Sequence, residues 1–504
     1  MAVLDHLFPP NLSKLGDRSV VVVDREGEML QPFTASDGRW RLPVAIDDVD
    51  PRYLRMLMAY EDKRFDWHFG VDPLAVGRAL TQVLTHGHIV SGASTLSMQA
   101  ARLLEPRPRT FRSKILEMAR ALQLEWHFNK KQILNIYLSL APFGGNIEGV
   151  RAASLFYFGK EPRLLTDSEA ALLVALPQSP ERLRPDRHGA AARARRDRVL
   201  ARLVDIGVLS AKAGIEATQQ AVPTLRRPAV RMASHLALRL KGENPAATTI
   251  SSLIDQTLQR PLELLARRYH SSLEDAATLA ILVVENSGRQ VRAYIGSGDY
   301  FDERRYGQND MVTAVRSPGS TLKPFIYGLA FDELLLHPET IVVDRPMRFA
   351  DFAPENFDHF YRGEVTAREA LQLSLNLPAV AVLSRLGPQR LFDALQAAGT
   401  PLRLPQDVSK PGLPIALGGA GTTLQDLVTL YAGIASGGRV LPLKFTDTDP
   451  QTKAVALMSE TAAWYLGRIL EDSPPPPNAI ASRNRDRVVP IAFKTGTSYG
   501  YRDA

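Results

Sequence analysis

Apolar and polar residues are spaced differently in the two halves of the chain, and the spacing predicts the elements of each half. An apolar run at 19–24 predicts a strand, and the turn after it leads into a second, more polar strand. Apolar residues at intervals of three and four predict helices over 54–60 and over the long stretch 111–140. A capping-box pattern opens another helix at 166–176, which ends before Pro177. The first half is therefore expected to be mainly helical.

The second half mixes helical and strand periods. After residue 249 the pattern changes to a short strand followed by a helix. Residues 279–284 and 291–295 flank an Asn-Ser-Gly turn and predict a β-hairpin. Helical and strand segments alternate beyond it, and residues 491–498 predict a further strand. Between the halves, residues 190–240 predict Arg-rich connecting helices exposed to solvent.

These patterns predict four segments. Residues 1–45 form an N-terminal strand segment, 46–210 a helical domain, 211–270 a linker and 271–504 a mixed α/β domain. A chain of 504 residues is also too long for one ordinary hydrophobic core, so length alone predicts more than one domain.

Composition narrows the classes of partner. The formal net charge of +7 favours anionic partners such as a membrane surface or a phosphorylated substrate. The arginines are scattered and no nucleic-acid-binding motif is present, so no nucleic acid partner is expected. The absence of cysteine excludes disulfides, zinc–thiolate sites and a thiol nucleophile. No stretch approaches the ~18 apolar residues that span a bilayer, and the first residues lack the pattern of a signal peptide.

Three short motifs in the second half can together form an acyl-transfer site. They are Ser320-Thr-Leu-Lys323, Ser374-Leu-Asn376 and Lys494-Thr495-Gly496. A serine hydroxyl needs a nearby base, and a lysine one helical turn later can be that base if its surroundings lower its pKa. The second motif adds a hydroxyl and an amide, and the third adds a cation and backbone N–H groups for an anionic substrate. Each motif alone occurs by chance, whereas the ordered set indicates a serine acyl-transfer enzyme.

A second group of polar residues lies in the first half. Glu61, Asp62 and His68 end an apolar helix, where they are placed for proton chemistry or for a polar helix cap. Residues 91–99 follow, and then Lys114 and Glu117, which are three apart and hence on one helix face. Taken alone, that last pair could be a surface ion pair worth well under ~1 kcal/mol.

Together the two groups resemble class A penicillin-binding proteins, and the resemblance covers essentially the whole chain. The motifs that carry it in the first half are Glu61-Asp-Lys-Arg-Phe65-Asp-Trp-His68-Phe-Gly70, Gly92-Ala-Ser94-Thr95-Leu-Ser-Met-Gln99, Lys114-Ile-Leu-Glu117, Tyr157-Phe-Gly159-Lys160 and Glu169 to Pro180. The resemblance implies a lysozyme-like, mostly helical peptidoglycan glycosyltransferase domain, followed by an α/β penicillin-binding transpeptidase domain.

The resemblance implies that the first domain joins lipid II units. Glu61 would be the base on the incoming sugar hydroxyl, by analogy with inverting carbohydrate chemistry. Glu117 would support the departing diphosphate together with Lys114 and, where one binds, a divalent metal such as Mg²⁺; no other cofactor is expected. The remaining substrate-binding residues would be Asp62, His68, Ser94, Thr95 and Gln99. Ser113 stands where the family usually has arginine, and Arg112 would point elsewhere on the helix.

For the second domain the resemblance implies a D-Ala-D-Ala transpeptidase. Ser320 would be acylated, Lys323 would be its base, and Ser374 would relay the proton to the leaving amine. Asn376 would hold the substrate amide. The terminal carboxylate would bind to the last motif, in which the substrate-binding residues are Lys494, Thr495, Gly496 and Thr497. The backbone N–H groups of Ser320 and Thr497 would form the oxyanion hole, and β-lactams would acylate Ser320 in place of the dipeptide.

The resemblance also implies partners and a place of action. The partners are lipid II, nascent peptidoglycan, β-lactams and the membrane surface, and the place is the bacterial inner membrane with both domains facing the periplasm. Two family features are not found in the sequence: an N-terminal membrane anchor, and the strands that follow the last motif. We therefore expect an incomplete transpeptidase sheet, and labelling of Ser320 by penicillin that is slow or absent.

Alternative functions remain open on sequence alone. One is a glycosyltransferase whose transpeptidase half is inactive. Another is a non-enzymatic β-lactam sensor, against which the complete set of glycosyltransferase motifs argues. A β-lactamase shares the serine and lysine motifs but has no use for residues 50–180.

Overall fold

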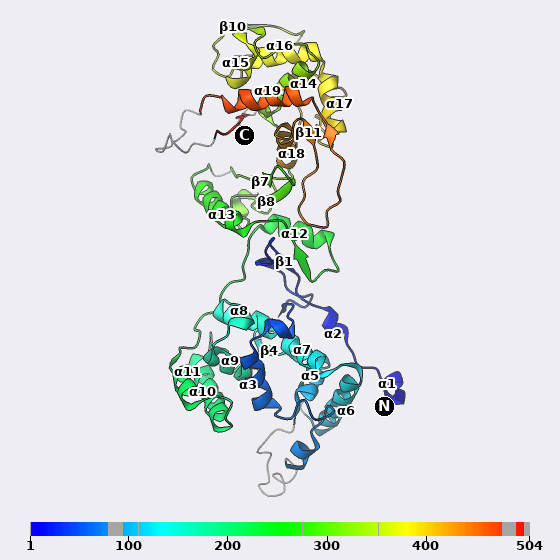
Figure 1. The fold of residues 1–504 in the computed structure, drawn as a ribbon, viewed down its shortest axis with the longest axis vertical. Helices are drawn as coiled ribbons and strands as arrows, with labels where there is room; N and C mark the ends of the chain where they lie inside the picture. Colours follow the sequence, from blue (N-terminus) through cyan, green and yellow to red (C-terminus); the bar gives the residue numbers. More distant parts are fainter. Residues whose placement is uncertain are drawn as a thin grey trace. The chain divides into compact units, whose positions relative to one another are not determined.

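The structure is a computed structural model that describes residues 2–78, 94–108, 110–274, 277–350, 352–475 and 490–497. The chain divides into two compact units, each with its own hydrophobic core (Figure 1). Unit 1 comprises residues 1–23, 29–231 and 240–250, and unit 2 comprises residues 24–28, 232–239 and 251–504. The sequence-based boundaries at 45, 210 and 270 stay predictions.

Unit 1 is mainly helical, as the sequence predicts. Its helices include α1 (Ala2–Leu7), α2 (Ser13–Gly16), α3 (Pro51–Glu61), α5 (Leu96–Leu104), α6 (Phe111–His127), α7 (Lys130–Leu140), α8 (Val150–Phe158), α9 (Asp167–Ala175), α10 (Gly189–Asp205) and α11 (Ala211–Gln219). Short strands form two small sheets, ordered β2 (Met29–Pro32), β1 (Val21–Val23), β6 (Thr249–Ser251) and β3 (Trp40–Arg41), β5 (Ile147–Glu148), β4 (Pro142–Gly144).

Helix α9 is at the centre of unit 1. Every residue from Ala170 to Leu176 is buried, and α3, α10 and α11 pack around the helix (Figure 1). The predicted capping box starts it, because Thr166 Oγ1 accepts a hydrogen bond from the Glu169 amide while the Glu169 carboxylate accepts one from the Thr166 amide. A second group of packed helices forms where α5 contacts α6 and α7.

Two helix predictions need correction. The stretch 111–140 is not one helix, since α6 ends at His127 and α7 starts at Lys130. Asn129 interrupts the helix because its side chain caps α7 in a capping box with Gln132. The Arg-rich helices after residue 190 are also not simply solvated. Arg196 is fully buried and donates hydrogen bonds to Asp197, Ser168 and the backbone of 218 and 220.

Unit 2 mixes helices with short antiparallel strands. Its helices are α13 (Gln256–His270), α14 (Lys323–Asp332), α15 (Ala367–Gln372), α16 (Asn376–Leu386), α17 (Pro388–Ala397), α18 (Leu424–Ile434) and α19 (Glu460–Glu471); α12 (Ser234–Glu243) contributes its first residues. The strand pairs are β7 (Ile281–Glu285) with β8 (Gln290–Ile295), β9 (Ile341–Asp344) with β10 (Gly363–Thr366), and β11 (Arg439–Val440) with β12 (Val455–Ala456). The β7–β8 pair is the predicted hairpin.

Helix α14 is the core of unit 2. Residues 323–331 are all buried, and α15, α16, α17 and α19 pack against the helix. A 3-10 turn at Gly319–Leu322 leads directly into it, so the start of this buried helix fixes the position of Ser320.

The predicted strand at 491–498 is not formed. Residues 490–497 run without strand pairing to any described segment, and Ser498 lies outside the described residues. A strand is defined by its backbone partner, and here no described strand lies alongside to pair with it. Of the helices that the structure describes, none is both long and apolar enough to cross a bilayer.

Candidate active sites

Glu61 is the last residue of α3, and side-chain amides hold its carboxylate on both oxygens. Gln99 Nε2 donates to Glu61 Oε2 over 2.9 Å, and Gln178 Nε2 donates to Glu61 Oε1 over 2.6 Å. Arg195 in turn donates to Gln178 Oε1, which turns the amide of Gln178 so that its NH₂ group meets the carboxylate. The two amide donors therefore hold the Glu61 carboxylate in one orientation at the end of α3.

Two buried tyrosines make the surroundings of this carboxylate less polar. Tyr53 and Tyr137 are buried, and their hydroxyl groups have no hydrogen-bond partner among the described residues. Burial raises the pKa of both phenols, and the negative charge of Glu61 raises each pKa further. Both phenols are therefore neutral, and Glu61 is the charged group that they border.

Asp62 and His68 bind each other rather than standing free. His68 Nε2 lies 2.9 Å from Asp62 Oδ2, and the same carboxylate accepts the backbone N–H of Leu96 over 2.9 Å at the start of α5. Thr95 caps that helix through the amide of Met98 and donates its hydroxyl to Gly70 O over 2.6 Å. These contacts fix the start of α5, and Gln99 lies on the first turns of the same helix.

Ser94, Lys114 and Glu117 form a second polar cluster. Lys114 Nζ donates to Ser94 Oγ and lies 3.3 Å from Glu117 Oε2. Burial lowers the pKa of Lys114, while Glu117 opposes this effect by raising that pKa. Arg102, on α5, adds a further positive charge that acts on Lys114, and no motif in the sequence marks this arginine.

The position of Arg112 agrees with the sequence argument. Its side chain is exposed on α6, whereas the side chain of Ser113 is buried and bonded to Thr110. Arg102 rather than Arg112 therefore supplies the extra cation beside Lys114.

The donor set for a metal is not assembled beside Glu117. In the described ranges no three His, Asp or Glu side chains come together as metal ligands. The ammonium group of Lys114 already occupies the position next to the Glu117 carboxylate that a cation would take. We therefore derive no step that uses a metal.

In unit 2 the three motifs converge on Lys323. This lysine is fully buried at the start of α14, and its Nζ donates to Ser374 O over 2.6 Å and to Asn376 Oδ1 over 2.7 Å. Its backbone N–H donates to Ser320 O, so the two residues share one turn. Burial lowers the pKa of Lys323 far below its usual value, and the nearby positive charge of Lys494 lowers it further. A lysine in these surroundings can act as a base near neutral pH.

Ser374 connects the two lysines. Its Oγ accepts a hydrogen bond from Lys494 Nζ over 2.8 Å and lies 3.5 Å from Lys323 Nζ. The backbone of Ser374 is left-handed, with φ of +56°, a conformation rare outside glycine that is often found at functional sites. Burial lowers the pKa of Lys494 to about 8. A hydroxyl held between two such lysines is suited to proton relay.

Asn356 supports this cluster, and sequence reasoning missed it. It is buried, its Nδ2 donates to both carboxylate oxygens of Asp344 over 2.8 and 2.9 Å, and its Oδ1 accepts the backbone N–H of Asn376 over 2.8 Å. Asn376 also donates its Nδ2 to Glu355 O over 2.7 Å. The loop before β10 therefore fixes the second motif. Nothing in the local pattern of that loop marks it as part of a site.

The last motif lies against the Ser320 turn. A Cβ on Gly496 would approach Thr321 Cγ2 to 2.6 Å and Pro318 O to 3.1 Å, so this backbone passes as close as a glycine permits. Thr495 accepts a hydrogen bond from Lys494 through its carbonyl, and Thr497 is exposed. The structure thus brings together the side chains of Lys323, Ser374, Asn376 and Lys494 from three distant parts of unit 2. Ser320 lies one turn before Lys323, and its hydroxyl makes no hydrogen bond to another described residue.

Comparisons with known proteins identify both halves. Residues 26–204 match the transglycosylase family, and residues 279–503 match the penicillin binding protein transpeptidase domain. The chain is 45% identical over 502 residues to penicillin-binding protein 1C of Escherichia coli K12, covering 99% of this chain and 64% of that relative. It is 30% identical over 480 residues to penicillin-binding protein 1F of Bacillus subtilis 168, covering 89% and 65%.

The chain thus spans less than two thirds of the length of these relatives. A solved structure, penicillin-binding protein 1A of Haemophilus influenzae, aligns over 91% of this chain and 80% of that chain with a TM-score of 0.47 and 16% identity. A mainly helical transglycosylase domain followed by an α/β transpeptidase domain is the fold class that the sequence predicted. The chain belongs to the class A penicillin-binding protein family.

Proposed function

We propose that the chain is a two-activity peptidoglycan synthase that polymerises lipid II in unit 1 and cross-links stem peptides in unit 2. We also propose that it works at the periplasmic face of the bacterial inner membrane, where a lipid-linked substrate is found. The observation that carries the proposal is the convergence of Lys323, Ser374 and Lys494 beside the turn that contains Ser320. In the other unit, two amide donors hold the Glu61 carboxylate.

In the acyl transfer, Ser320 Oγ attacks the carbonyl of the penultimate D-alanine while neutral Lys323 takes the hydroxyl proton. The new ester bond forms and the bond to the terminal D-alanine nitrogen breaks, with Ser374 passing the proton to the leaving amine. An amine of a second stem peptide then attacks the ester, which releases Ser320. A β-lactam reacts by the same first step, because its ring amide takes the place of the peptide bond.

In the glycosyl transfer, Glu61 takes the proton of the acceptor 4-hydroxyl as its oxygen attacks the anomeric carbon. The bond from that carbon to the diphosphate–lipid oxygen breaks, and the anomeric configuration inverts. Lys114, with Arg102 nearby, offsets the negative charge that remains on the diphosphate.

A single experiment tests both activities. The chain is incubated with fluorescent lipid II, and glycan strands are measured on gels while cross-linked muropeptides are measured after digestion. Benzylpenicillin should remove the cross-linked products and leave strand formation unchanged. Strands without any cross-links would contradict the assignment of unit 2, and cross-linking of supplied strands without polymerisation would contradict that of unit 1.

Lys114 should matter to polymerisation and Arg112 should not. A Lys114→Met variant loses the cation that meets the leaving diphosphate, so we expect a loss of about tenfold to a hundredfold in strand formation. Arg112→Met, two residues away on the exposed side of α6, should stay within about twofold. Equal losses in both variants, measured by initial rates on fluorescent lipid II, would contradict the role of Lys114.

Acylation should decline above pH 8. The ammonium group of Lys494 binds the substrate carboxylate and is lost as pH rises through its pKa of about 8. The second-order rate of acylation by benzylpenicillin should therefore fall about tenfold per pH unit well above pH 8. A Lys494→Arg variant keeps its charge and should lose this decline. A flat profile from pH 7 to 10 in the unaltered chain would argue against the assignment.

A side chain on Gly496 should separate the last motif from the Ser320 turn. The added Cβ of Gly496→Ala meets Thr321 and the Pro318 carbonyl at distances that require the backbone to move. We expect acylation to slow by at least about tenfold, since positioning errors of about 1 Å already cost far more than that. Gly467→Ala on α19, where a Cβ meets nothing within 4 Å, is the matched control and should not slow it.

A further inference from the structure

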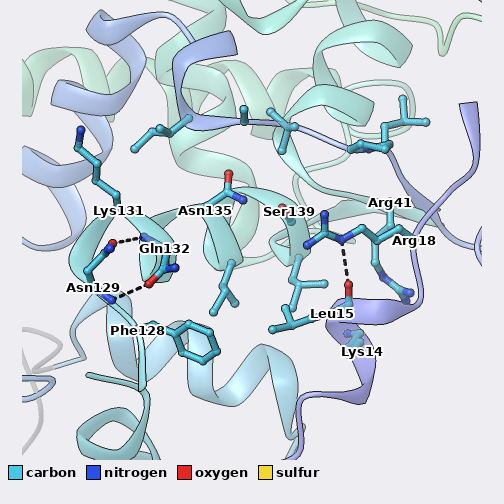
Figure 2. Close-up of a pocket in the computed structure, with 17 residues that line it drawn as sticks. Lys14, Leu15, Arg18, Arg41, Phe128, Asn129, Lys131, Gln132, Asn135 and Ser139 are labelled. Carbon is cyan, nitrogen blue, oxygen red and sulfur yellow. Dashed lines mark hydrogen bonds between the residues drawn. The ribbon is translucent and has the colours of Figure 1, made fainter. Parts of the chain in front are cut away.

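A pocket of about 430 Å³ lies in unit 1, apart from the Glu61 and Lys114 clusters. Its walls come from α2, from the extended segment 41–46 and from α7 (Figure 2). Most of the walls are apolar, with Leu15, Val44, Phe128 and Ile136 among the lining residues. Apolar walls with a few polar groups, at this volume, are typical of a small-molecule site.

Arg18 is a positively charged residue of this pocket, and its guanidinium group has N–H donors available for a ligand. Its Nε donates to Leu15 O over 2.8 Å, and within the described ranges its two terminal nitrogens have no partner. Figure 2 shows the guanidinium group directed towards Ser139 along α7. Arg41, which also lines the pocket, is committed elsewhere, because it is buried and paired with Glu148 and Asp17. The two terminal nitrogens of a guanidinium group match the two oxygens of a carboxylate, sulfonate or phosphate.

Helix α7 presents a polar stripe to the same pocket. Lys131, Asn135 and Ser139 are four residues apart, hence on one face of the helix, and all three line the pocket. Their side chains make no hydrogen bond to a described residue, and Asn135 Oδ1 is shielded from solvent without a partner. Polar groups inside a mainly apolar pocket are normally satisfied by water or by a ligand. The amide of Asn135 is thus free to turn towards one.

We propose that this pocket binds a small amphiphilic anion. Its acidic head pairs with Arg18, a hydroxyl or N–H group meets Asn135 and Ser139, and its apolar body lies against Leu15 and Phe128. Two sources have this chemistry, the headgroup region of an anionic phospholipid and a free aromatic or fatty acid. The proposal does not depend on the activity of either unit.

The first test uses 8-anilinonaphthalene-1-sulfonate, an aryl sulfonate with an N–H donor, titrated into the whole chain by fluorescence. We expect Arg18→Gln to weaken binding by about tenfold or more, as loss of a bidentate charged contact predicts. Arg163→Gln, an exposed arginine of the same unit, is the control for net charge. Equal affinities in the unaltered chain and in Arg18→Gln, or equal weakening in both variants, would overturn the proposal.

A second variant guards against misfolding, and competitors separate the two sources. Ser139→Leu fills the pocket from α7, so it should also weaken binding while the circular dichroism spectrum stays unchanged. Monomeric dihexanoylphosphatidylglycerol and 4-hydroxyphenylacetate then compete with the sulfonate on the unaltered chain. Displacement by the phospholipid alone identifies a lipid site, whereas displacement by 4-hydroxyphenylacetate alone identifies a site for free acids. Displacement by neither, or no effect of Ser139→Leu, would refute the proposal.

Discussion

Replacing Ser320 with alanine should abolish covalent labelling by a fluorescent penicillin under conditions in which the unaltered chain becomes labelled, however slowly. The hydroxyl of Ser320 is the atom that forms the ester, and no neighbouring group can replace it. The substitution removes one oxygen from a partly exposed side chain, so it leaves the packing of the buried helix α14 intact. The measurement is gel fluorescence against time.

The base can be tested on the same gels. Lys323→Met keeps the length and apolar stem of the side chain, but it cannot accept a proton, so acylation should slow by about 10²- to 10⁴-fold. The control for Ser320→Ala is Ser271→Ala, which also loses a hydroxyl, at an exposed serine at the end of α13, and should label normally. Label that persists in Ser320→Ala would place the nucleophile elsewhere and would contradict the reading of all three motifs.

The elements that the sequence predicts correctly are those whose signals are local. The capping box at Thr166 and the hairpin at 281–295 each depend on residues a few positions apart, and both form as expected. The break at Asn129 is local too, but the apolar spacing on either side continues with little change, which made two helices look like one. The segment predicted as a strand at 491–498 has no pairing partner among the described residues, because a strand forms only against a neighbour. This agrees with the incomplete sheet that the sequence led us to expect.

The residues of the two sites also differ in how far the sequence could predict them. Motifs contain the residues whose chemistry the reaction needs, so Glu61, Ser320 and Lys323 could be named from the sequence. Residues that hold those groups come from other segments. Gln178 contacts Glu61 from beyond α9, Arg195 contacts Gln178 in turn, and Asn356 contacts the second motif from a loop. Gln178 stands inside a family motif, so a signal existed for it. For Arg195 and Asn356 only the folded chain shows the contact.

Replacing Glu61 with glutamine should reduce lipid II polymerisation by about 10²- to 10⁴-fold, the range that a general base contributes. Glutamine has nearly the same shape and can still accept the hydrogen bonds of Gln99 or Gln178 on its one oxygen, so α3 should stay in place. It cannot take the proton of the acceptor hydroxyl. Initial rates with fluorescent lipid II measure the loss, and Asp66→Asn, an exposed carboxylate five residues further on, is the control for charge.

The same variant separates the two units. Because the acylation cluster lies wholly in unit 2, Glu61→Gln should label with penicillin at the rate of the unaltered chain. Equal losses in polymerisation and in labelling would mean that the substitution damages folding rather than proton transfer. Polymerisation within about threefold of normal would move the base to another carboxylate. Glu117 would then be the next to test, because it is the carboxylate of the other polar cluster in unit 1.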